Sequence, residues 1–322
     1  MTPRDSWDGL SSPARGVAMV RRYPPPVVLV RDLPRSEAAR GRAAGELVEV
    51  RRGVLAPPID PSSSRTVRDL HTVLLHVSAF VHHVRADLPV SHQSAALLLG
   101  CWVLNPRLPV HVTAPPPPSG GRDRTGDVMR HHLPLTFDEI RLHRDLLVTS
   151  IERTAVDCAR TLPFLEALTV VDSALRMGAD GEVIRHRIAS LGGARGVAAA
   201  RRVVAFATAS VHSPGETVVR GIALAGGLPR PETLHRVDTE IGTLELDVAW
   251  PERGVAVEFD GAVKLAGLRG EALTRQVAAN LRREAALVRA GWVVLHLTWS
   301  DLADRVSLLI RLRQLVNHRT VR

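Results

Sequence analysis

The sequence predicts a mixed α/β protein, α+β overall, with a C-terminal mixed sheet flanked by helices. Before this sheet we expect a small N-terminal element and a mostly helical middle domain. Two C-terminal segments alternate apolar and polar residues with the period of a strand, whereas residues 62–104 and 153–207 are largely helical in pattern. With 322 residues, 45% of them hydrophobic, the chain is long enough for two or three domains with buried cores.

Proline and glycine clusters mark the boundaries between these parts. Prolines 24–26 close the N-terminal stretch, and the prolines at 115–118 mark the clearest loop of the chain. We therefore expect a disordered N-terminus (1–25), a partial winged-helix-like element (26–60), a mostly helical middle domain with a loop at 114–126 (61–208), and a C-terminal domain (209–322).

The segment 26–60 combines a short helical stretch with a basic strand. The helix begins at Arg35 and closes at Gly45, and the strand carries Arg51 and Arg52 before a glycine turn. A short helix that leads into a basic strand and a glycine turn is typical of the end of a small winged helix. We therefore expect these two arginines to contact DNA. An ordinary αβ unit is the alternative.

In the middle domain we expect a buried helix that is capped by Ser91 and ended by Gly100. Several histidines lie in the same domain, among them the pair His131-His132. No acid or cysteine stands at a spacing that matches them, so we interpret them as surface or core residues rather than as metal ligands.

The charge of the chain is carried almost entirely by arginine. The net charge is +9 and the isoelectric point about 11.1, and because arginine forks onto phosphate oxygens this favours a nucleic-acid partner. Only 3% of the residues are aromatic, which argues against single-strand binding by base stacking. Cys101 and Cys158 lack a CxxC spacing, and the sequence has neither a signal-like start nor a long apolar run. We expect a soluble, cytoplasmic protein without a membrane partner.

Two strand-like segments, 243–250 and 255–260, flank the short turn 251–254. Such a connection predicts an antiparallel hairpin in which Trp250 pairs with Val255. In this register one face of the hairpin is apolar and consists of Leu246/Phe259, Val248/Val257 and Trp250/Val255.

The same register brings carboxylates together on the other face. Asp247 falls opposite Glu258, and Glu245 falls opposite Asp260. Like charges that face each other destabilise a sheet, so something must neutralise them. A hard divalent cation with oxygen ligands is the preferred candidate, and Mg²⁺ held by Asp247 and Glu258 fits. A solvated outer face of the sheet is the alternative.

Downstream, residues 271–290 are expected to form a helix that ends at Gly291. Its apolar residues Val277, Leu281 and Val288 are expected to point inward. Its basic residues Arg275, Arg282 and Arg283 are expected to point outward, toward solvent. A buried strand at 292–299 and a closing helix at 301–316, capped by Ser300, complete the chain.

Lys264 is the single lysine among the 42 Lys and Arg residues, and it follows the acidic run that begins at Glu258. Lysine can lose its proton or act as a compact point charge, whereas arginine cannot. A lysine beside clustered carboxylates is therefore a candidate for chemistry. The chance survival of one lysine is the alternative.

The region from Ser213 onward resembles the very-short-patch-repair-like branch of the PD-(D/E)XK nuclease superfamily. The matching features are Glu216, Asp247, Glu258-Phe-Asp260-Gly261, the basic pair Arg282-Arg283 and the strand Gly291-Trp-Val-Val. Lys264 stands where this family usually carries His. The resemblance implies a restriction-endonuclease-like fold and a catalytic site made of Glu216, Asp247, Glu258, Asp260 and Lys264.

Glu216 has a second interpretation. The stretch Ser213-Pro-Gly-Glu216 is a good helix start, with Ser as the N-cap, Pro at the first position and Glu at the third. Glu216 is therefore expected to cap a helix, to act in catalysis, or to do both.

The N-terminal part resembles abortive-infection-type antitoxins of type IV toxin–antitoxin systems. The matching stretches are Val50-Arg-Arg-Gly53-Val, Ser91-His-Gln-Ser-Ala-Ala and Thr149-Ser-Ile-Glu-Arg153-Thr-Ala-Val-Asp157-Cys-Ala-Arg160. This resemblance implies a winged-helix DNA-binding element before a helical domain. It also implies a cognate toxin, or another defence-system protein, as the partner.

Two functions follow from these patterns. The first is a Mg²⁺-dependent DNA endonuclease, in which the metal activates a bound water and Arg275, Arg282 and Arg283 grip the DNA backbone. The second is a non-catalytic DNA-binding regulator of the antitoxin kind.

Overall fold

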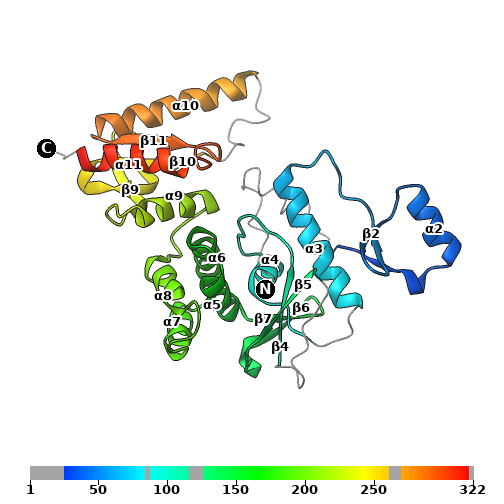
Figure 1. Cartoon of the computed structure of the whole chain (residues 1–322). Coiled ribbons are helices and arrows are strands. Elements are labelled where there is room, and N and C mark those ends of the chain that lie inside the picture. Colours follow the sequence, from blue (N-terminus) through cyan, green and yellow to red (C-terminus); the bar gives the residue numbers. More distant parts are fainter. Residues whose placement is uncertain (1–24, 84–87, 116–125, 261–269, 319–322) are drawn as a thin grey trace.

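The computed structural model describes residues 25–83, 88–115, 126–260 and 270–318. Three units follow one another along the molecule, from a small N-terminal element through a middle domain to a C-terminal sheet (Figure 1). The architecture is mixed α/β without a barrel, as the sequence predicts. Within these residues no helix has the length and hydropathy needed to cross a bilayer. The expected disordered N-terminus, the centre of the loop at 114–126 and Lys264 lie outside the described residues.

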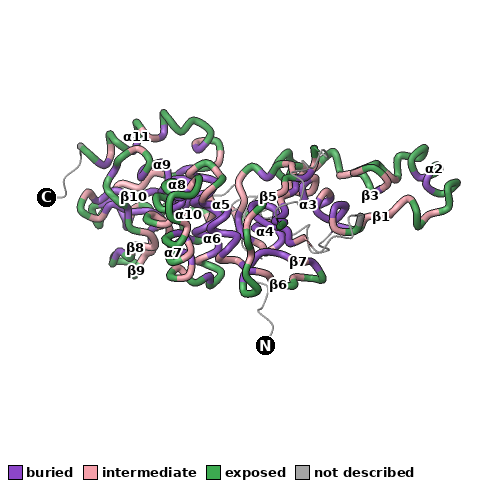
Figure 2. The backbone as a smooth tube through the Cα atoms, turned by 60° about the horizontal axis from the view of Figure 1, so that its bottom comes forward, coloured by how far each residue is buried: buried purple, intermediate pink, exposed green. Residues whose placement is uncertain are grey.

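The N-terminal element is a helix beside a three-stranded sheet of order β1-β3-β2. Its elements are β1 (Val28–Leu29), the 3-10 turn η1 (Val30–Asp32), α2 (Arg35–Ala43), β2 (Val48–Arg51) and β3 (Val54–Ala56). Gly41 lets α2 pack closely against the Leu47 side chain, because a Cβ at Gly41 would lie 2.7 Å from Leu47 Cδ1. Most of α2 remains exposed, and only Ala38 and Gly41 are buried (Figure 2).

The middle domain begins with two helices and a small sheet. These are α3 (Arg65–His83), α4 (His92–Leu99), β4 (Val110–Ala114), β5 (Val128–His132), the 3-10 turn η2 (Phe137–Glu139), β6 (Ile140–His143) and β7 (Leu146–Thr149). The buried helix α4 is confirmed, and Gly100 has the left-handed conformation that ends it. Ser91 stands at the N-cap position, but its side chain makes no capping hydrogen bond and instead lies 2.9 Å from His92 Nδ1. The strands β5, β6 and β7 were not expected. Strand β4 pairs in parallel with β5, which lies further along the chain. Such a pairing cannot be predicted from local sequence, because parallel strands are not joined by a short turn.

Four helices complete the middle domain: α5 (Ile151–Thr161), α6 (Phe164–Arg176), α7 (Gly181–Ser190) and α8 (Val197–Phe206). Ser150 caps α5 through the Arg153 N–H, and Asp180 caps α7 through the Glu182 N–H. Small residues such as Ala155, Ala167 and Ala174 fill their shared core, which lets the helices approach closely. This is the second helical block that the sequence predicts.

The C-terminal unit is a four-stranded mixed sheet of order β11-β10-β9-β8. Its elements are α9 (Pro214–Ala225), β8 (Glu232–Thr239), β9 (Gly242–Trp250), the 3-10 turn η3 (Pro251–Arg253), β10 (Val255–Phe259), α10 (Gly270–Arg289), β11 (Val293–Leu297) and α11 (Arg305–His318). The predicted register is confirmed next to the turn, where Trp250 pairs with Val255 and Val248 with Val257. The ladder does not extend to the predicted pairs Leu246/Phe259 and Glu245/Asp260. Helices α9 and α11 share a hydrophobic core with β9 and β10.

The second face of the sheet is not the open acidic surface that the hairpin pattern suggested. Helix α10 covers it, and Leu287 packs there with Ala249 and Ala256. Leu246 also belongs to this second core rather than to the first. Helix α11 begins at Arg305 instead of Asp301, because the Asp304 carboxylate accepts the Ser307 N–H at 3.0 Å and provides the cap.

The apolar residues of α10 do not point inward as the sequence predicts, although Arg275 and Arg282 are exposed as expected. Val277, Leu281 and Val288 are 40%, 62% and 59% exposed, although they were expected to point inward. Ala286 and Leu287 are buried instead, and Arg283 lies one turn before them on the same face. Small alanines on the sheet and on α10 allow the helix to pack closely on this face. The side of α10 that carries Val277, Leu281 and Val288 therefore faces solvent.

A buried ion pair joins the middle domain to the C-terminal unit. Asp172 on α6 is 0% exposed and Arg220 on α9 is 1% exposed. Their side chains meet with Arg220 Nη2 2.5 Å from Asp172 Oδ2, and Thr217 donates to the same oxygen at 3.0 Å. Gly221 brings the helices together, because a Cβ there would lie 2.5 Å from Leu165 Cδ2.

We predict that Asp172→Ala lowers the free energy of unfolding by about 3–5 kcal/mol, because it leaves the Arg220 charge buried without its partner. The double variant Asp172→Leu/Arg220→Met is expected to lose less than the single variant, since it removes both charges. Urea denaturation measures both changes. The exposed pair Glu182 and Arg185 provides the control, and Glu182→Ala should change stability far less than Asp172→Ala, because solvent screens an exposed ion pair. Equal costs at the buried and the exposed pair would contradict this role.

Candidate functional site

The predicted acidic pair lies where the hairpin ladder ends. The last registered pair of β9 and β10 is Val248 with Val257. Beyond it, the Asp247 side chain takes the place of a backbone acceptor, and the Phe259 N–H donates to Asp247 Oδ2 at 2.8 Å. Asp247 and Glu258 thus lie on neighbouring strands, as predicted, but Asp247 is engaged with the backbone of the partner strand.

An arginine compensates the charge of Glu258. The carboxylate is 7% exposed, and Arg283 Nη2 of α10 lies 2.5 Å from its Oε1. The same guanidinium donates to the Glu245 carbonyl oxygen at 2.5 Å, so it joins both strands. Arg283 therefore supplies a neutralising charge at Glu258, and the Mg²⁺ site stays a prediction. Arg283 points inward and is not part of the outward basic face that was expected.

The other predicted acids have partners of their own. Glu216 is buried in the first turn of α9 and accepts the His212 N–H at 2.7 Å. The helix start is confirmed, because Ser213 accepts the Glu216 N–H and Pro214 opens the helix. Asp260 Oδ2 lies 2.9 Å from His296 Nδ1 on the adjacent strand β11. Glu245 faces Arg236 of β8. Lys264 lies outside the described residues, so its place near these acids stays a prediction.

Some of the arginines that were expected to contact DNA are exposed, and others contact residues of the protein itself. Arg275 and Arg282 on α10 are exposed. Arg52 at the β2–β3 turn is also exposed, whereas Arg51 is engaged within the protein. The Arg51 side chain reaches Asp127 at 3.5 Å and lies over the Phe80 ring at 5.5 Å, so it fastens the N-terminal sheet to the middle domain.

Helix α2 adds arginines that the sequence argument did not select. Arg35, Arg40 and Arg42 are exposed along it, and Arg42 lies 3.6 Å from Glu49. The basic character of this short helix is visible in the sequence, but its exposure depends on how little of α2 is packed. Exposed arginines are suited to contacts with DNA phosphates.

The motif around Arg153 builds a buried polar network rather than a catalytic site. Arg153 Nε donates to both oxygens of Asp157, at 3.1 and 3.0 Å, and its Nη1 donates to Glu139 at 2.9 Å. Burial raises the pKa of the Asp157 carboxyl to about 6, although Arg153 opposes this shift. Arg187 on α7 also pairs with Glu139. The network fastens η2 to α5 and α7.

Three histidines of the middle domain lie together although the sequence pattern gave no sign of it. One ring nitrogen from each of His92, His111 and His131 lies within 4.8 Å of the others. His111 Nδ1 is 2.9 Å from His131 Nε2, and the His92 and His131 rings stack at 3.6 Å between centroids. Burial lowers the pKa of His111 and of His131 to about 4, and it also lowers that of His92. Among the described residues, this is the one group with three potential metal ligands in reach of one ion.

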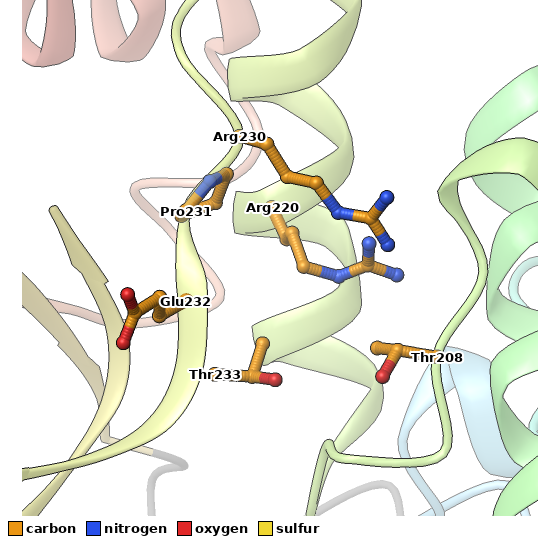
Figure 3. Close-up of a pocket in the computed structure, with 6 residues that line it drawn as sticks. All are labelled: Thr208, Arg220, Arg230, Pro231, Glu232 and Thr233. Atoms are coloured by element: carbon orange, nitrogen blue, oxygen red, sulfur yellow. The ribbon is translucent and has the colours of Figure 1, made fainter.

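A pocket of about 350 Å³ opens beside the Asp172–Arg220 pair. It is lined by Thr208, Arg220, Arg230, Pro231, Glu232 and Thr233. Figure 3 shows the guanidinium groups of Arg220 and Arg230 close together, one from α9 and one from the loop that follows it. Because Asp172 already neutralises Arg220, the pocket carries less positive charge than its two arginines suggest.

Residues 89–206 match the family model of the AbiEi antitoxin C-terminal domain. This segment coincides with a folded part of the middle domain, from the strand pairing at Val90 to the end of α8. The match supports the antitoxin-like part of the expectation. The comparisons give the nuclease-like part no support.

Two curated relatives are the uncharacterized proteins Rv2248 and MT2308 from two strains of Mycobacterium tuberculosis. Each is 30% identical over 158 residues, which is 48% of this chain and 56% of the relative. The chain thus spans about half the length of these relatives. Among solved structures, the crystal structure of the Rv2827c protein from Mycobacterium tuberculosis aligns with 72% of this chain and 88% of its own chain. The identity is 17% and the TM-score 0.37.

We predict that Arg283→Ala lowers the free energy of unfolding by about 1–3 kcal/mol, because the buried Glu258 carboxylate loses its charged donor. The neighbouring exposed Arg282→Ala is the control and should stay within about 0.5 kcal/mol of the wild type. Urea denaturation with and without millimolar Mg²⁺ measures both. If Arg283→Ala were neutral and Mg²⁺ raised the stability of the wild type, a cation rather than Arg283 would compensate Glu258.

Proposed function

We propose that this chain is a non-catalytic DNA-binding regulator of the antitoxin kind. The observation that carries the proposal is the match of residues 89–206 to the AbiEi antitoxin C-terminal domain. A cognate toxin, or another defence-system protein, is the protein partner that this class implies. The buried network around Arg153 and Asp157 supports a scaffold role for this segment, since it fastens η2 to α5 and α7.

The N-terminal element is the proposed DNA-contacting part. Its sheet order β1-β3-β2 with one helix before the β2–β3 hairpin supports the partial winged-helix interpretation. Arg35 and Arg40 on α2 and Arg52 at the hairpin tip are exposed, so all three can approach phosphates. Arg51 contributes indirectly, because its contact with Asp127 holds the hairpin against the middle domain.

The alternative is a Mg²⁺-dependent endonuclease at Asp247, Glu258, Glu216 and Asp260. The helix–hairpin–helix–strand order of the C-terminal unit is the observation that favours it. The partners of these acids favour the regulator instead. Glu258 is neutralised by Arg283, and Asp247 and Glu216 accept backbone N–H groups. Such hydrogen bonds stabilise carboxylates without a cation.

We predict salt-dependent binding of double-stranded DNA through α2. The variant Arg35→Ala/Arg40→Ala should weaken binding and flatten the slope of log K against log salt by about 0.9 for each phosphate that the protein no longer neutralises. Fluorescence anisotropy over a salt series measures this slope. Arg195→Ala/Arg201→Ala removes the same charge from the exposed end of the helical bundle and should leave the slope unchanged. An effect confined to Arg275→Ala/Arg282→Ala would place the DNA surface on α10.

We also predict that the wild-type chain does not cut supercoiled plasmid DNA with Mg²⁺ or Mn²⁺, because its acids are engaged by protein donors. Agarose electrophoresis of the plasmid detects nicked and linear products. Asp247→Ala is the matched control for contaminating nucleases. Cleavage by the wild type that disappears in Asp247→Ala would establish the endonuclease and reject the regulator as a complete account.

A further inference from the structure

The histidine cluster joins three elements that are distant in sequence. His92 is the first residue of α4, His111 lies on β4 and His131 lies on the parallel neighbour β5. His92 has a φ of 53°, a left-handed conformation that is uncommon for a residue with a side chain. Its ring is 2% exposed and stacks on His131. The backbone of His92 thus adopts an uncommon conformation at the position where the His92 ring enters the histidine cluster.

The nitrogen geometry suits a shared cation. A neutral imidazole has one bare nitrogen, and this is the form that binds Zn²⁺, Cu²⁺ or Ni²⁺. A tetrahedral zinc site with Zn–N bonds of about 2.0–2.1 Å separates its nitrogens by about 3.3 Å. His111 Nδ1 and His131 Nε2 are 2.9 Å apart, so they need to separate by only a few tenths of an ångström. A ring nitrogen of His92 lies within 4.8 Å of both.

The surroundings orient the rings as outer partners of metal ligands do. Ser91 Oγ lies 2.9 Å from His92 Nδ1, and the buried Asp157 carboxylate lies 4.0 Å from it, which leaves Nε2 for a cation. The Gln93 amide N–H donates to His111 Nε2 at 3.2 Å, so the proton of neutral His111 lies on Nδ1 and points to His131 Nε2. A cation that binds at His111 Nδ1 displaces this proton. The nearby positive charge of Arg153 is compensated by its own acidic partners.

We propose that His92, His111 and His131 form a binding site for a divalent transition metal ion, with Zn²⁺ as the preferred ion. Imidazole ligands favour Zn²⁺, Cu²⁺ and Ni²⁺ over Mg²⁺, so this site differs in chemistry from the acidic hairpin. Three protein ligands leave a fourth position for water or an added ligand. The ion would connect α4 to the β4–β5 sheet inside the antitoxin-like segment. Because it binds only the folded arrangement, it would stabilise this segment.

The test uses the full chain, purified without a histidine tag and stripped with EDTA. Zn²⁺ and Co²⁺ are titrated separately, and the metal content after gel filtration is measured by mass spectrometry. We expect one equivalent of metal per chain, a higher melting temperature with Zn²⁺, and visible Co²⁺ absorption of a nitrogen-ligated site. His111→Gln and His131→Ala should each lose the bound equivalent and the shift in melting temperature.

The matched control is His132→Ala, which removes the next histidine of the same strand. His132 is exposed, and its Nδ1 lies 3.1 Å from the Pro115 carbonyl oxygen, outside the cluster. This variant should keep the full equivalent of metal. Melting in EDTA shows whether each variant is folded without the ion. A folded wild type that retains no stoichiometric metal, or triad variants that bind as the wild type does, would overturn the site. In that case the three rings form a hydrogen-bonded stack of neutral imidazoles.

Discussion

The pairing of Asp172 with Arg220 is the contact on which the relation between the two larger units depends. Both side chains are buried between α6 and α9, so neither charge can return to water while the helices remain packed. Asp172 also accepts the Thr208 N–H at 2.8 Å, which fixes the connection that leads from α8 into α9. The sheet that follows α9 is therefore held in a defined position relative to the helical bundle, and a pocket remains beside this junction.

Arginine plays a structural part throughout this chain, and this changes the meaning of its positive charge. Arg153, Arg220 and Arg283 each serve a buried carboxylate with the forked geometry that lysine lacks. These three arginines are consequently engaged within the protein. The positive charge that a nucleic acid can reach includes the exposed arginines of α2 and those on the outer face of α10.

The antitoxin-like segment owes its form to polar contacts as much as to its alanine-rich core. Glu139 receives Arg153 from α5 and Arg187 from α7, so one buried acid connects three elements. The histidine cluster lies on the other side of Asp157, which approaches His92. The proposed metal site and the ion-pair network are therefore neighbours. An ion there would add a cross-link between α4 and the β4–β5 sheet to the connections that the arginines already make.

Elements with local signals could be predicted from the amino-acid pattern alone. Trp250 and Val255 fixed the hairpin register through their alternation, and Ser213 and Gly100 marked a helix start and a helix end. The charged partners could not be predicted in this way, because they depend on how segments distant along the chain pack together. Arg283 points inward to Glu258, whereas Leu281 is exposed. The reason is that α10 packs on Ala249 and Ala256 of the sheet with the face that carries Leu287. His92, His111 and His131 came together for the same reason: the parallel pairing of β4 with β5 has no counterpart in local spacing.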